Sequence, residues 1–277
     1  MKVLIIGKGY IGQRCAEVWS EAVWSDRYIE TSQDVLDLLD KYQPDAVLNA
    51  AGVVGKPNVD WCETHQLETI QGNTILPLLI ARACQQKNVY LLHIGTGCIF
   101  YGPSPHGGPW TEEDYANPVA VYTRSKYAAD LTLATMLNIG IARIRMPLDS
   151  RPHPANLIDK LISFQRVVDV ENSLTVVEDM VDVFHQLLEK KASGIFHVTN
   201  PGSIKHREIL AMYQELVDPG HHNEWIKEED LLAQGLVNKK RSNNIMTSLN
   251  LPELGITMRP VQEAVRDALQ KYGQHLK

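Results

Sequence analysis

Short, almost wholly apolar runs alternate with longer amphipathic stretches through the first two thirds of the chain. The apolar runs have the length of buried β-strands, and most are bounded by Gly, Pro or Asn. The longer stretches carry apolar residues at three- and four-residue spacing, which is typical of helices. The predicted strands are Lys2–Ile6, Ala22–Asp26, Ala46–Ala50, Val89–Ile94, Ile139–Arg145 and Ile195–Thr199. The predicted helices are Ile11–Trp19, Gln33–Tyr42, Leu67–Gln86, Tyr122–Met136 and Val177–Lys190.

This alternation predicts an α/β fold with a Rossmann-type doubly wound parallel sheet, because strands this apolar must be covered by helices on both faces. The pattern loosens after Pro147. We therefore expect a Rossmann domain over residues 1–147, completed by about 171–200. Residues 148–170 and 201–277 are expected to form a smaller C-terminal substrate-binding cap over the carboxyl ends of the strands, where open α/β sheets bind ligands.

Composition narrows the class of protein. The 277 residues carry a formal net charge of −6 and no clustered basic stretch, so a nucleic-acid partner is not expected. No apolar run reaches membrane-spanning length, and the N-terminus runs straight into a buried strand rather than a secretory signal. The cysteines show no C-x-x-C pair, which indicates neither a zinc site nor a disulfide framework. We expect a cytoplasmic protein with no membrane segment and no metal ion.

A glycine-rich turn follows the first predicted strand. Gly7, Gly9 and Gly12 form a G-x-G-x-x-G pattern that opens the first helix, which is the context required for dinucleotide binding. Glycines allow a tight turn and a close backbone approach, so a pyrophosphate can rest on the amides of the helix N-terminus. The sequence therefore predicts a dinucleotide site in the Rossmann domain.

Three charged residues leave the choice of dinucleotide open. Asp26, near the end of the second strand, is placed to hold the ribose 2′-hydroxyl of NAD. Arg27, together with Lys8 of the glycine turn, offers positive charge to the 2′-phosphate of NADP. A solvated charged turn explains the same three residues equally well.

A second constellation combines Tyr122 and Lys126 with Thr96. Tyr and Lys at i and i+4 share one face of a helix, and Thr96 ends an apolar strand upstream. A phenol with a pKa near ~10 must lose about three units to act as an acid or base near neutrality. We expect a neighbouring ammonium and a nicotinamide cation to supply that shift, while Thr96 orients the same carbonyl. Together with the glycine turn, the pattern indicates an enzyme that acts on a carbonyl group.

These residues resemble the extended short-chain dehydrogenase/reductase family over nearly the whole chain. Within it they are similar to the bifunctional 3,5-epimerase/4-reductase subfamily that completes UDP-rhamnose synthesis, and more distantly to dTDP-4-dehydrorhamnose reductases. The matching stretches are Asn49–Gly52, Ala51–Glu63, Asn73, Gly95–Phe100, Arg143–Pro147, Thr199–Gly202 and Arg241–Asn244.

The resemblance implies conversion of UDP-4-keto-6-deoxyglucose to UDP-β-L-rhamnose by epimerisation at C3 and C5 and reduction at C4, with NADPH or alternatively NADH. Tyr122 would donate a proton at C4, Thr96 would bind the ketone, and Lys126 would hold the ribose and lower the pKa of Tyr122. The family's epimerase base matches Cys98, which follows Thr96 by two positions and is expected on the same side of the strand by two-residue alternation. The family's partner acid matches Lys160. On residue type alone, Cys98 is equally a small buried apolar residue and Lys160 a solvated helix residue.

The resemblance also assigns binding residues. The cofactor neighbours are Gly7, Gly9, Tyr10, Ile11, Gly12, Asp26, Arg27, Ala50, Ala51, Gly52, Tyr122 and Lys126. The substrate neighbours are Asn58, Trp61, Thr96, Gly97, Cys98, Arg241 and Asn244. Arg241 is equally part of an exposed basic run. The glycine turn is one residue shorter than the G-x-x-G-x-x-G of the relatives, so Tyr10 and Ile11 are the firmer cofactor neighbours.

The family further implies a homodimer and a separate 4,6-dehydratase that supplies the ketosugar. Two other functions stay open at this point. One is a plain 4-reductase that receives an already epimerised ketosugar, with Cys98 and Lys160 structural. The other is a non-catalytic NADP-binding regulator, which would have no need of the proton donor Tyr122.

Overall fold

The computed structural model describes residues 1–56, 58–237 and 239–276. The chain divides into two compact units. The first unit consists of Met1–Ile99, Pro118–Arg143 and Val181–Phe196. The second consists of Phe100–Asn117, Ile144–Met180 and the chain from His197 onward.

A six-stranded parallel sheet confirms the predicted doubly wound α/β fold. Its strand order is β10-β5-β4-β3-β1-β2. Successive strands are added first on one side of β1 and then on the other, since β1 pairs with β2 on one side and with β3 on the other. Such a switch point opens a crevice at the carboxyl ends of the central strands. The strands are β1 (Val3–Ile6), β2 (Ala22–Ser25), β3 (Ala46–Asn49), β4 (Tyr90–Thr96), β5 (Ile139–Ile144) and β10 (Gly194–Val198).

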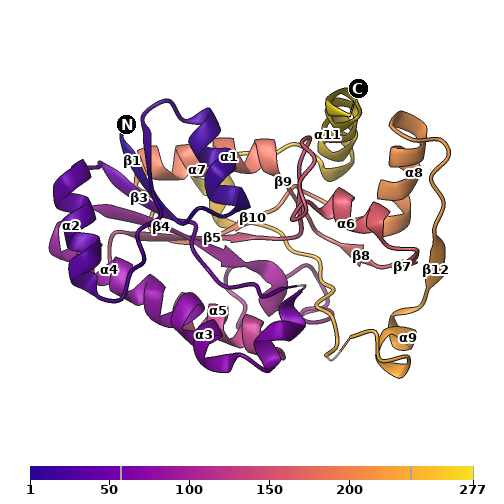
Figure 1. The fold of residues 1–277 in the computed structure, drawn as a ribbon, viewed down its shortest axis with the longest axis horizontal. Helices are drawn as coiled ribbons and strands as arrows, with labels where there is room; N and C mark the ends of the chain where they lie inside the picture. Colours follow the sequence, from indigo (N-terminus) through magenta and orange to yellow (C-terminus); the bar gives the residue numbers. More distant parts are fainter. Residues whose placement is uncertain (57, 238, 277) are drawn as a thin grey trace. The chain divides into compact units, whose positions relative to one another are not determined.

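Helices cover both faces of this sheet. In Figure 1, α1 (Tyr10–Val18) and α7 (Val177–Lys190) lie on one face, and α2 (Ser32–Tyr42), α4 (Leu76–Gln86) and α5 (Val121–Leu133) lie on the other. The apolar sides of α2, α4 and α5 form one core cluster with β1, β3, β4 and β5. These helices use the three- and four-residue spacing seen in the sequence, and α7 has the predicted limits.

A π-turn interrupts the long helix predicted over Leu67–Gln86. The chain forms α3 (Gln66–Ile70), then one π-helical turn, Gln71–Ile75, and then α4. A Cβ on Gly72 would lie 2.4 Å from Val53 Cγ2, so the turn packs tightly against the loop after β3. The sequence predicts one continuous helix here and does not predict this turn, which is a rare feature inside helices.

The second unit is built from short strand pairs and helices around its own apolar core. Parallel pairs join β6 (Pro147–Leu148) to β9 (Thr175–Val176) and β7 (Arg166–Val168) to β12 (Glu224–Ile226), and an antiparallel pair joins β8 (Glu171–Asn172) to β11 (Ile204–Lys205). The helices are α6 (Leu157–Ser163), α8 (His206–Leu216), α9 (Glu228–Ala233), α10 (Asn250–Glu253) and α11 (Val261–His275).

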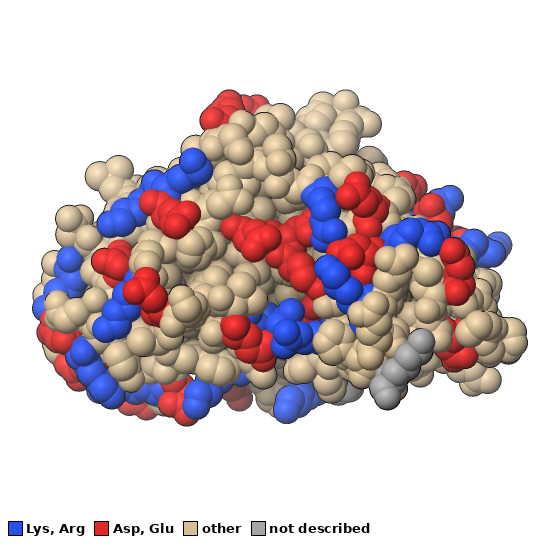
Figure 2. Space-filling view, turned by 90° about the horizontal axis from the view of Figure 1, so that it is seen from above, with Lys and Arg blue, Asp and Glu red and all other residues tan. Residues whose placement is uncertain are grey.

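Charge is mixed over the surface face drawn in Figure 2, where Lys and Arg side chains alternate with Asp and Glu. Within the described ranges, no helix has the length and apolarity needed to cross a membrane. A search of the same residues finds no group of three or more His, Cys, Asp or Glu side chains that could hold a metal ion.

Candidate active site

The glycine turn between β1 and α1 is shaped for close backbone contact. Gly7 has a φ of +108°, and a Cβ there would lie 2.5 Å from the Ala51 nitrogen. A Cβ on Gly12 would lie 2.5 Å from the Gly7 carbonyl oxygen, so Gly12 lets α1 pack against the turn. Gly9 precedes α1 with no side-chain cap and no acidic residue in the first helical turn. The residues present therefore fit a dinucleotide whose pyrophosphate rests at this helix end.

Substituting these glycines separately distinguishes folding from dinucleotide binding. We expect Gly12→Ala to lower the free energy of unfolding by about 1–3 kcal/mol, because its Cβ meets backbone. Gly9→Ala is the matched variant: Gly9 has a φ of −75°, and the nearest atom to an added Cβ is the Ala50 oxygen at 4.0 Å. We expect it to keep the wild-type melting temperature and to weaken NADPH binding by about tenfold or more, since the methyl group enters the pyrophosphate site. Unchanged NADPH affinity in a fluorescence titration of Gly9→Ala would contradict the assigned site.

The turn after β3 lies against the glycine turn and is fixed by its own backbone. The Ala50 N–H donates to the Ile6 carbonyl at 2.9 Å, and the Ala51 N–H donates to Asn49 Oδ1 at 3.1 Å. The predicted cofactor segment Ala50–Gly52 is thus held at the carboxyl ends of β1 and β3. Tyr10 and Ile11 open α1 directly after the glycine turn.

Asn73 of the π-turn ties this segment to α5. Its Nδ2 donates to the Val53 carbonyl at 2.8 Å, and its Oδ1 accepts the Val53 N–H at 2.8 Å. Asn73 Nδ2 also donates to Ser125 Oγ at 3.2 Å, and Thr74 Oγ1 donates to the Ser125 carbonyl at 2.8 Å. Because Ser125 precedes Lys126, the π-turn links the cofactor segment to the helix that carries Tyr122. Irregular turns of this kind recur at functional sites.

Trp24 on β2 is a residue of this site that the sequence analysis did not single out. Its indole N–H donates to the Gly7 carbonyl at 2.9 Å and so fixes the glycine turn. Lys8 Nζ lies 5.8 Å from the centre of the Trp24 ring. A tryptophan in an apolar strand carries no sequence signal of this contact, although its N–H regularly finds a partner when half-buried.

The charged residues that bear on cofactor choice are engaged with neighbouring side chains. Lys8 Nζ lies 2.6 Å from Asp26 Oδ2, and this hydrogen bond lowers the pKa of Asp26. Arg27 donates to Asp34 at 2.6 Å and to Asp37 at 3.1 Å. Pairs as exposed as Lys8 and Asp26 exchange partners at little cost, so selectivity between NAD and NADP stays a prediction.

Four predicted catalytic residues come together where β4 ends and α5 begins. Thr96, the last residue of β4, accepts the Cys98 N–H on Oγ1 at 3.2 Å and is hydrogen-bonded to the Tyr122 hydroxyl. Lys126 lies one turn further along α5 and is 6% exposed. Its Nζ donates to the Ile94 carbonyl at 2.7 Å. The first unit therefore assembles a phenol, a hydroxyl, a thiol and an ammonium at one place.

The pKa values of this cluster differ from expectation. Burial raises the pKa of Tyr122 and a Cys98 charge adds to the rise, while the Thr96 hydrogen bond opposes it. Burial outweighs any lowering of this pKa by the nearby Lys126 ammonium, whose Nζ donates to the Ile94 carbonyl. The lowering expected with a nicotinamide cation stays a prediction. Burial lowers the pKa of Lys126 to about 8. Tyr122 therefore keeps its proton at neutral pH, which is the state required of a proton donor.

Cys98 does not lie on a strand. The argument that placed it beside Thr96 by strand alternation is wrong, because β4 ends at Thr96 and Gly97–Ile99 form a 3-10 turn. The turn still brings Cys98 to Thr96 through the backbone hydrogen bond. All four cysteines lie in the described part of the chain, and Cys15, Cys62 and Cys84 are buried whereas Cys98 is half-buried. Its partial exposure to solvent thus distinguishes Cys98 from the other three thiols.

Asn58 and Trp61, two predicted substrate residues, lie at a 3-10 helix, Val59–Glu63, in the first unit. Asn58 Oδ1 accepts the Asp60 N–H at 2.8 Å and caps this helix. The Trp61 ring stacks on His65 with centres 3.8 Å apart and planes at 9°. Local contacts therefore explain how both side chains are held, and their contact with a nucleotide stays a prediction.

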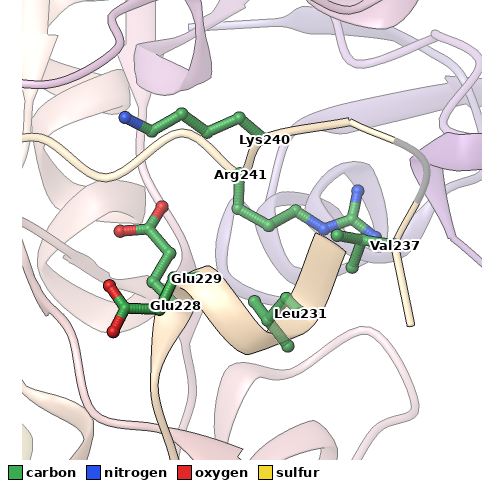
Figure 3. Close-up of a pocket in the computed structure, with 6 residues that line it drawn as sticks. All are labelled: Glu228, Glu229, Leu231, Val237, Lys240 and Arg241. Carbon is green, nitrogen blue, oxygen red and sulfur yellow. The ribbon is translucent and has the colours of Figure 1, made fainter. Parts of the chain in front are cut away.

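Lys160, Arg241 and Asn244 belong to the second unit. Lys160 lies on α6 with an exposed side chain. Arg241 lines a hollow of about 210 Å³ beside α9, and Figure 3 shows the carboxylates of Glu228 and Glu229 on one side of it. In the same view, Lys240 and Arg241 extend in opposite directions. The hollow thus carries both signs of charge.

Asn244 is buried and holds several backbone segments of the second unit together. Its Nδ2 donates to the Phe100 carbonyl at 2.8 Å and to Ser242 Oγ at 2.9 Å, and its N–H donates to Asn172 Oδ1 at 3.0 Å. It also lines a hollow of about 430 Å³ beside the loop that includes Trp110. A structural role is evident, and a role in substrate binding stays a prediction.

A model of the RmlD substrate binding domain family matches residues 1–273. The chain belongs to the RmlD family. It is 32% identical over 282 residues to the bifunctional dTDP-4-dehydrorhamnose 3,5-epimerase/dTDP-4-dehydrorhamnose reductase of Arabidopsis thaliana, covering 97% of this chain and 91% of the plant protein. The family assignment makes the chain an extended short-chain dehydrogenase/reductase and an NAD(P)-dependent oxidoreductase of the 4-dehydrorhamnose reductase family.

Two solved structures are similar to this RmlD-family chain over nearly its whole length. The L780 UDP-rhamnose synthase from Acanthamoeba polyphaga mimivirus superposes with a TM-score of 0.91 at 28% identity, covering 98% of this chain and 99% of that one. The dTDP-4-dehydrorhamnose reductase from Bacillus anthracis in complex with NADP has the same fold, with a TM-score of 0.83 at 20% identity over 98% of each chain.

Proposed function

We propose that the protein converts UDP-4-keto-6-deoxyglucose to UDP-β-L-rhamnose by 3,5-epimerisation followed by NADPH-dependent 4-keto reduction. The observation that carries this proposal is the meeting of Thr96, Cys98, Tyr122 and Lys126 at the carboxyl end of β4. A regulator that only senses NADP would need neither the buried proton donor nor the hydroxyl beside it.

The reduction needs a proton at the C4 oxygen and a group that holds the ketone. Tyr122 keeps its proton at neutral pH and donates it, and Thr96 hydrogen-bonds the same oxygen. The bound nicotinamide supplies the hydride. The glycine turn, Ala50–Gly52 and Lys126 would hold the dinucleotide, and the ammonium of Lys126 would also stabilise the phenolate that Tyr122 leaves behind.

The epimerisation needs a base and an acid on opposite faces of the sugar. Protons at C3 and C5 are acidic because the C4 ketone delocalises the resulting carbanion, which Thr96 and Tyr122 stabilise by hydrogen bonds. Cys98, half-buried beside Thr96, is the proposed base, and Lys160 the proposed acid. The plant relative, a bifunctional 3,5-epimerase/reductase, supports this part of the proposal.

A monofunctional 4-reductase is the second candidate, and one observation favours it. The Lys160 side chain is exposed on α6, which is the ordinary environment of a solvated helix lysine. In that case an already epimerised ketosugar is the substrate, and Cys98 and Lys160 have no chemical role.

NADPH oxidation with defined ketosugars tests the proposal. We expect turnover with UDP-4-keto-6-deoxyglucose and with its 3,5-epimerised form, and a higher rate with NADPH than with NADH. The same assays are run with the corresponding dTDP sugars, since the plant relative is named for a dTDP sugar and the mimivirus protein for a UDP sugar. Turnover of the epimerised ketosugar alone would establish the 4-reductase, and no turnover of any ketosugar would overturn both.

The proposal includes a homodimer in the cytoplasm that receives its ketosugar from a separate 4,6-dehydratase. Exposed apolar side chains support the dimer: Leu67 and Ile70 on α3, Ile75 in the π-turn and Leu131 on α5. These elements pack against one another in the first unit. Light scattering of the purified protein measures the oligomeric state, and a mass equal to one chain would exclude this arrangement.

A further inference from the structure

A buried ion pair lies one helical turn beyond Lys126. Arg143 Nε donates to Asp130 Oδ2 at 2.9 Å, and the two side chains are 2% and 0% exposed. Asp130 follows Lys126 by four positions on α5, so the two residues lie on the same side of the helix. Burying two charges costs several kcal/mol for each ion, so such a pair is weak evidence for a stabilising role.

The pair packs directly behind the end of β4. A Cβ on Gly95 would lie 3.3 Å from Asp130 Oδ1 and 3.1 Å from Arg143 Cγ. The preceding residue on β4, Ile94, accepts the hydrogen bond from Lys126 Nζ. A side chain at this position would crowd the pair by a few tenths of an ångström. The pair therefore lies against the short stretch of strand that carries the acceptor of Lys126.

Two titratable groups near Lys126, His93 and Tyr122, do not supply a negative charge. Burial lowers the pKa of His93 on β4, so its imidazole is neutral, and Tyr122 is held protonated by burial. The attraction of Asp130 opposes the loss of the Lys126 proton. The titratable and charged groups that surround Lys126 and Tyr122 are His93 on β4, Cys98 on the 3-10 turn, Cys62 on the first 3-10 helix, Tyr122 and Asp130 on α5 and Arg143 on β5.

We propose that Asp130, held by Arg143, is a positioning residue that keeps Lys126 charged and directed at Ile94 behind the reacting groups. The inference rests on the role given to Lys126 in the proposed function. Without Asp130, the buried Lys126 and Arg143 cations would both lose the carboxylate that attracts them. Lys126 is the one that can release a proton, because a guanidinium does not. A neutral Lys126 could no longer stabilise the phenolate formed when Tyr122 gives up its proton.

The test compares wild type, Asp130→Asn and the double variant Asp130→Asn/Arg143→Gln. The double variant removes the guanidinium together with its carboxylate partner, so no unpaired Arg143 charge is left buried, which guards against a simple folding failure. The titration of Lys126 is followed directly by the ¹³Cε resonance of ¹³C-lysine protein, assigned with Lys126→Arg. We expect its midpoint, about 8 in the wild type, to fall in both variants. A fall of about one unit would reduce ketone reduction roughly eightfold near pH 8.5 and hardly change it near pH 6.5.

Each outcome decides the proposal. If a folded variant keeps the wild-type midpoint of the Lys126 titration and the wild-type pH–rate profile, the Asp130–Arg143 pair is only structural. Failure of both variants to fold would lead to the same conclusion. A lowered midpoint with the expected loss of rate at high pH supports it. The NMR titration needs no substrate, so an absence of ketosugar turnover in the wild type would refute the proposed function while leaving this measurement intact.

Discussion

Tyr122→Phe is expected to slow ketosugar reduction by roughly 10²–10⁴-fold while NADPH binds as in the wild type. The substitution removes only the hydroxyl that Thr96 holds and that burial keeps protonated. The ring, which is half-buried, retains its packing. The loss should therefore fall on kcat and not on the affinity for the dinucleotide. Single-turnover reduction and an NADPH titration measure the two effects separately.

Tyr127→Phe is the matched control, because Tyr127 lies on the same helix and has no assigned chemistry. We expect its reduction rate to stay within a few-fold of wild type. A Tyr122→Phe enzyme with near wild-type kcat would mean that another group supplies the proton, and the assembly at the end of β4 would then need a different explanation.

Cys98→Ala is expected to abolish turnover of UDP-4-keto-6-deoxyglucose while reduction of the pre-epimerised ketosugar continues near the wild-type rate. The thiol is the proposed base at C3 and C5, and the reduction uses Tyr122 and Thr96 instead. The expected loss is about 10²-fold or more, the typical contribution of a positioned base. The rates with the unepimerised and the pre-epimerised ketosugar are measured on the same preparation. Their ratio, compared with the wild-type ratio, decides whether Cys98 acts as the base.

Cys84→Ala is the control for this experiment, because burial raises the pKa of Cys84 to about 12 and leaves that thiol inert. It should leave both rates unchanged. Equal losses with both sugars in Cys98→Ala would indicate a damaged site rather than a missing base.

Lys160→Gln examines the partner acid in the same assay: a normal rate with the unepimerised sugar would remove Lys160 from the mechanism.

The sequence was sufficient to predict the sheet and the glycine turn that follows its first strand. Apolar runs and amphipathic spacing are local properties, so they placed all six strands of the sheet to within two residues at each end and gave α7 its observed limits. The glycine turn was predictable because Gly7 and Gly12 are required by backbone contacts that no other residue tolerates. The Tyr122 and Lys126 pair shares a helix face in any regular helix.

Features that depend on tertiary contact were not predictable. The place of Cys98 was inferred from strand alternation, but the strand stops at Thr96 and the chain turns. The direction in which the pKa of Tyr122 shifts depends on its burial and on the hydrogen bond that Lys126 donates. Neither can be inferred from the spacing of residues in the sequence. The contact of Trp24 with Gly7 joins elements whose register only the folded sheet sets.

Proton NMR of UDP-4-keto-6-deoxyglucose, incubated with the protein and NADPH in heavy water, tests the central claim most directly. The proposed mechanism predicts UDP-β-L-rhamnose with deuterium at both C3 and C5, because each carbon exchanges its proton with a protein group before reduction. An unlabelled 6-deoxyhexose with unchanged configuration at C3 and C5 would contradict the epimerase half, and the protein would then be a 4-reductase alone.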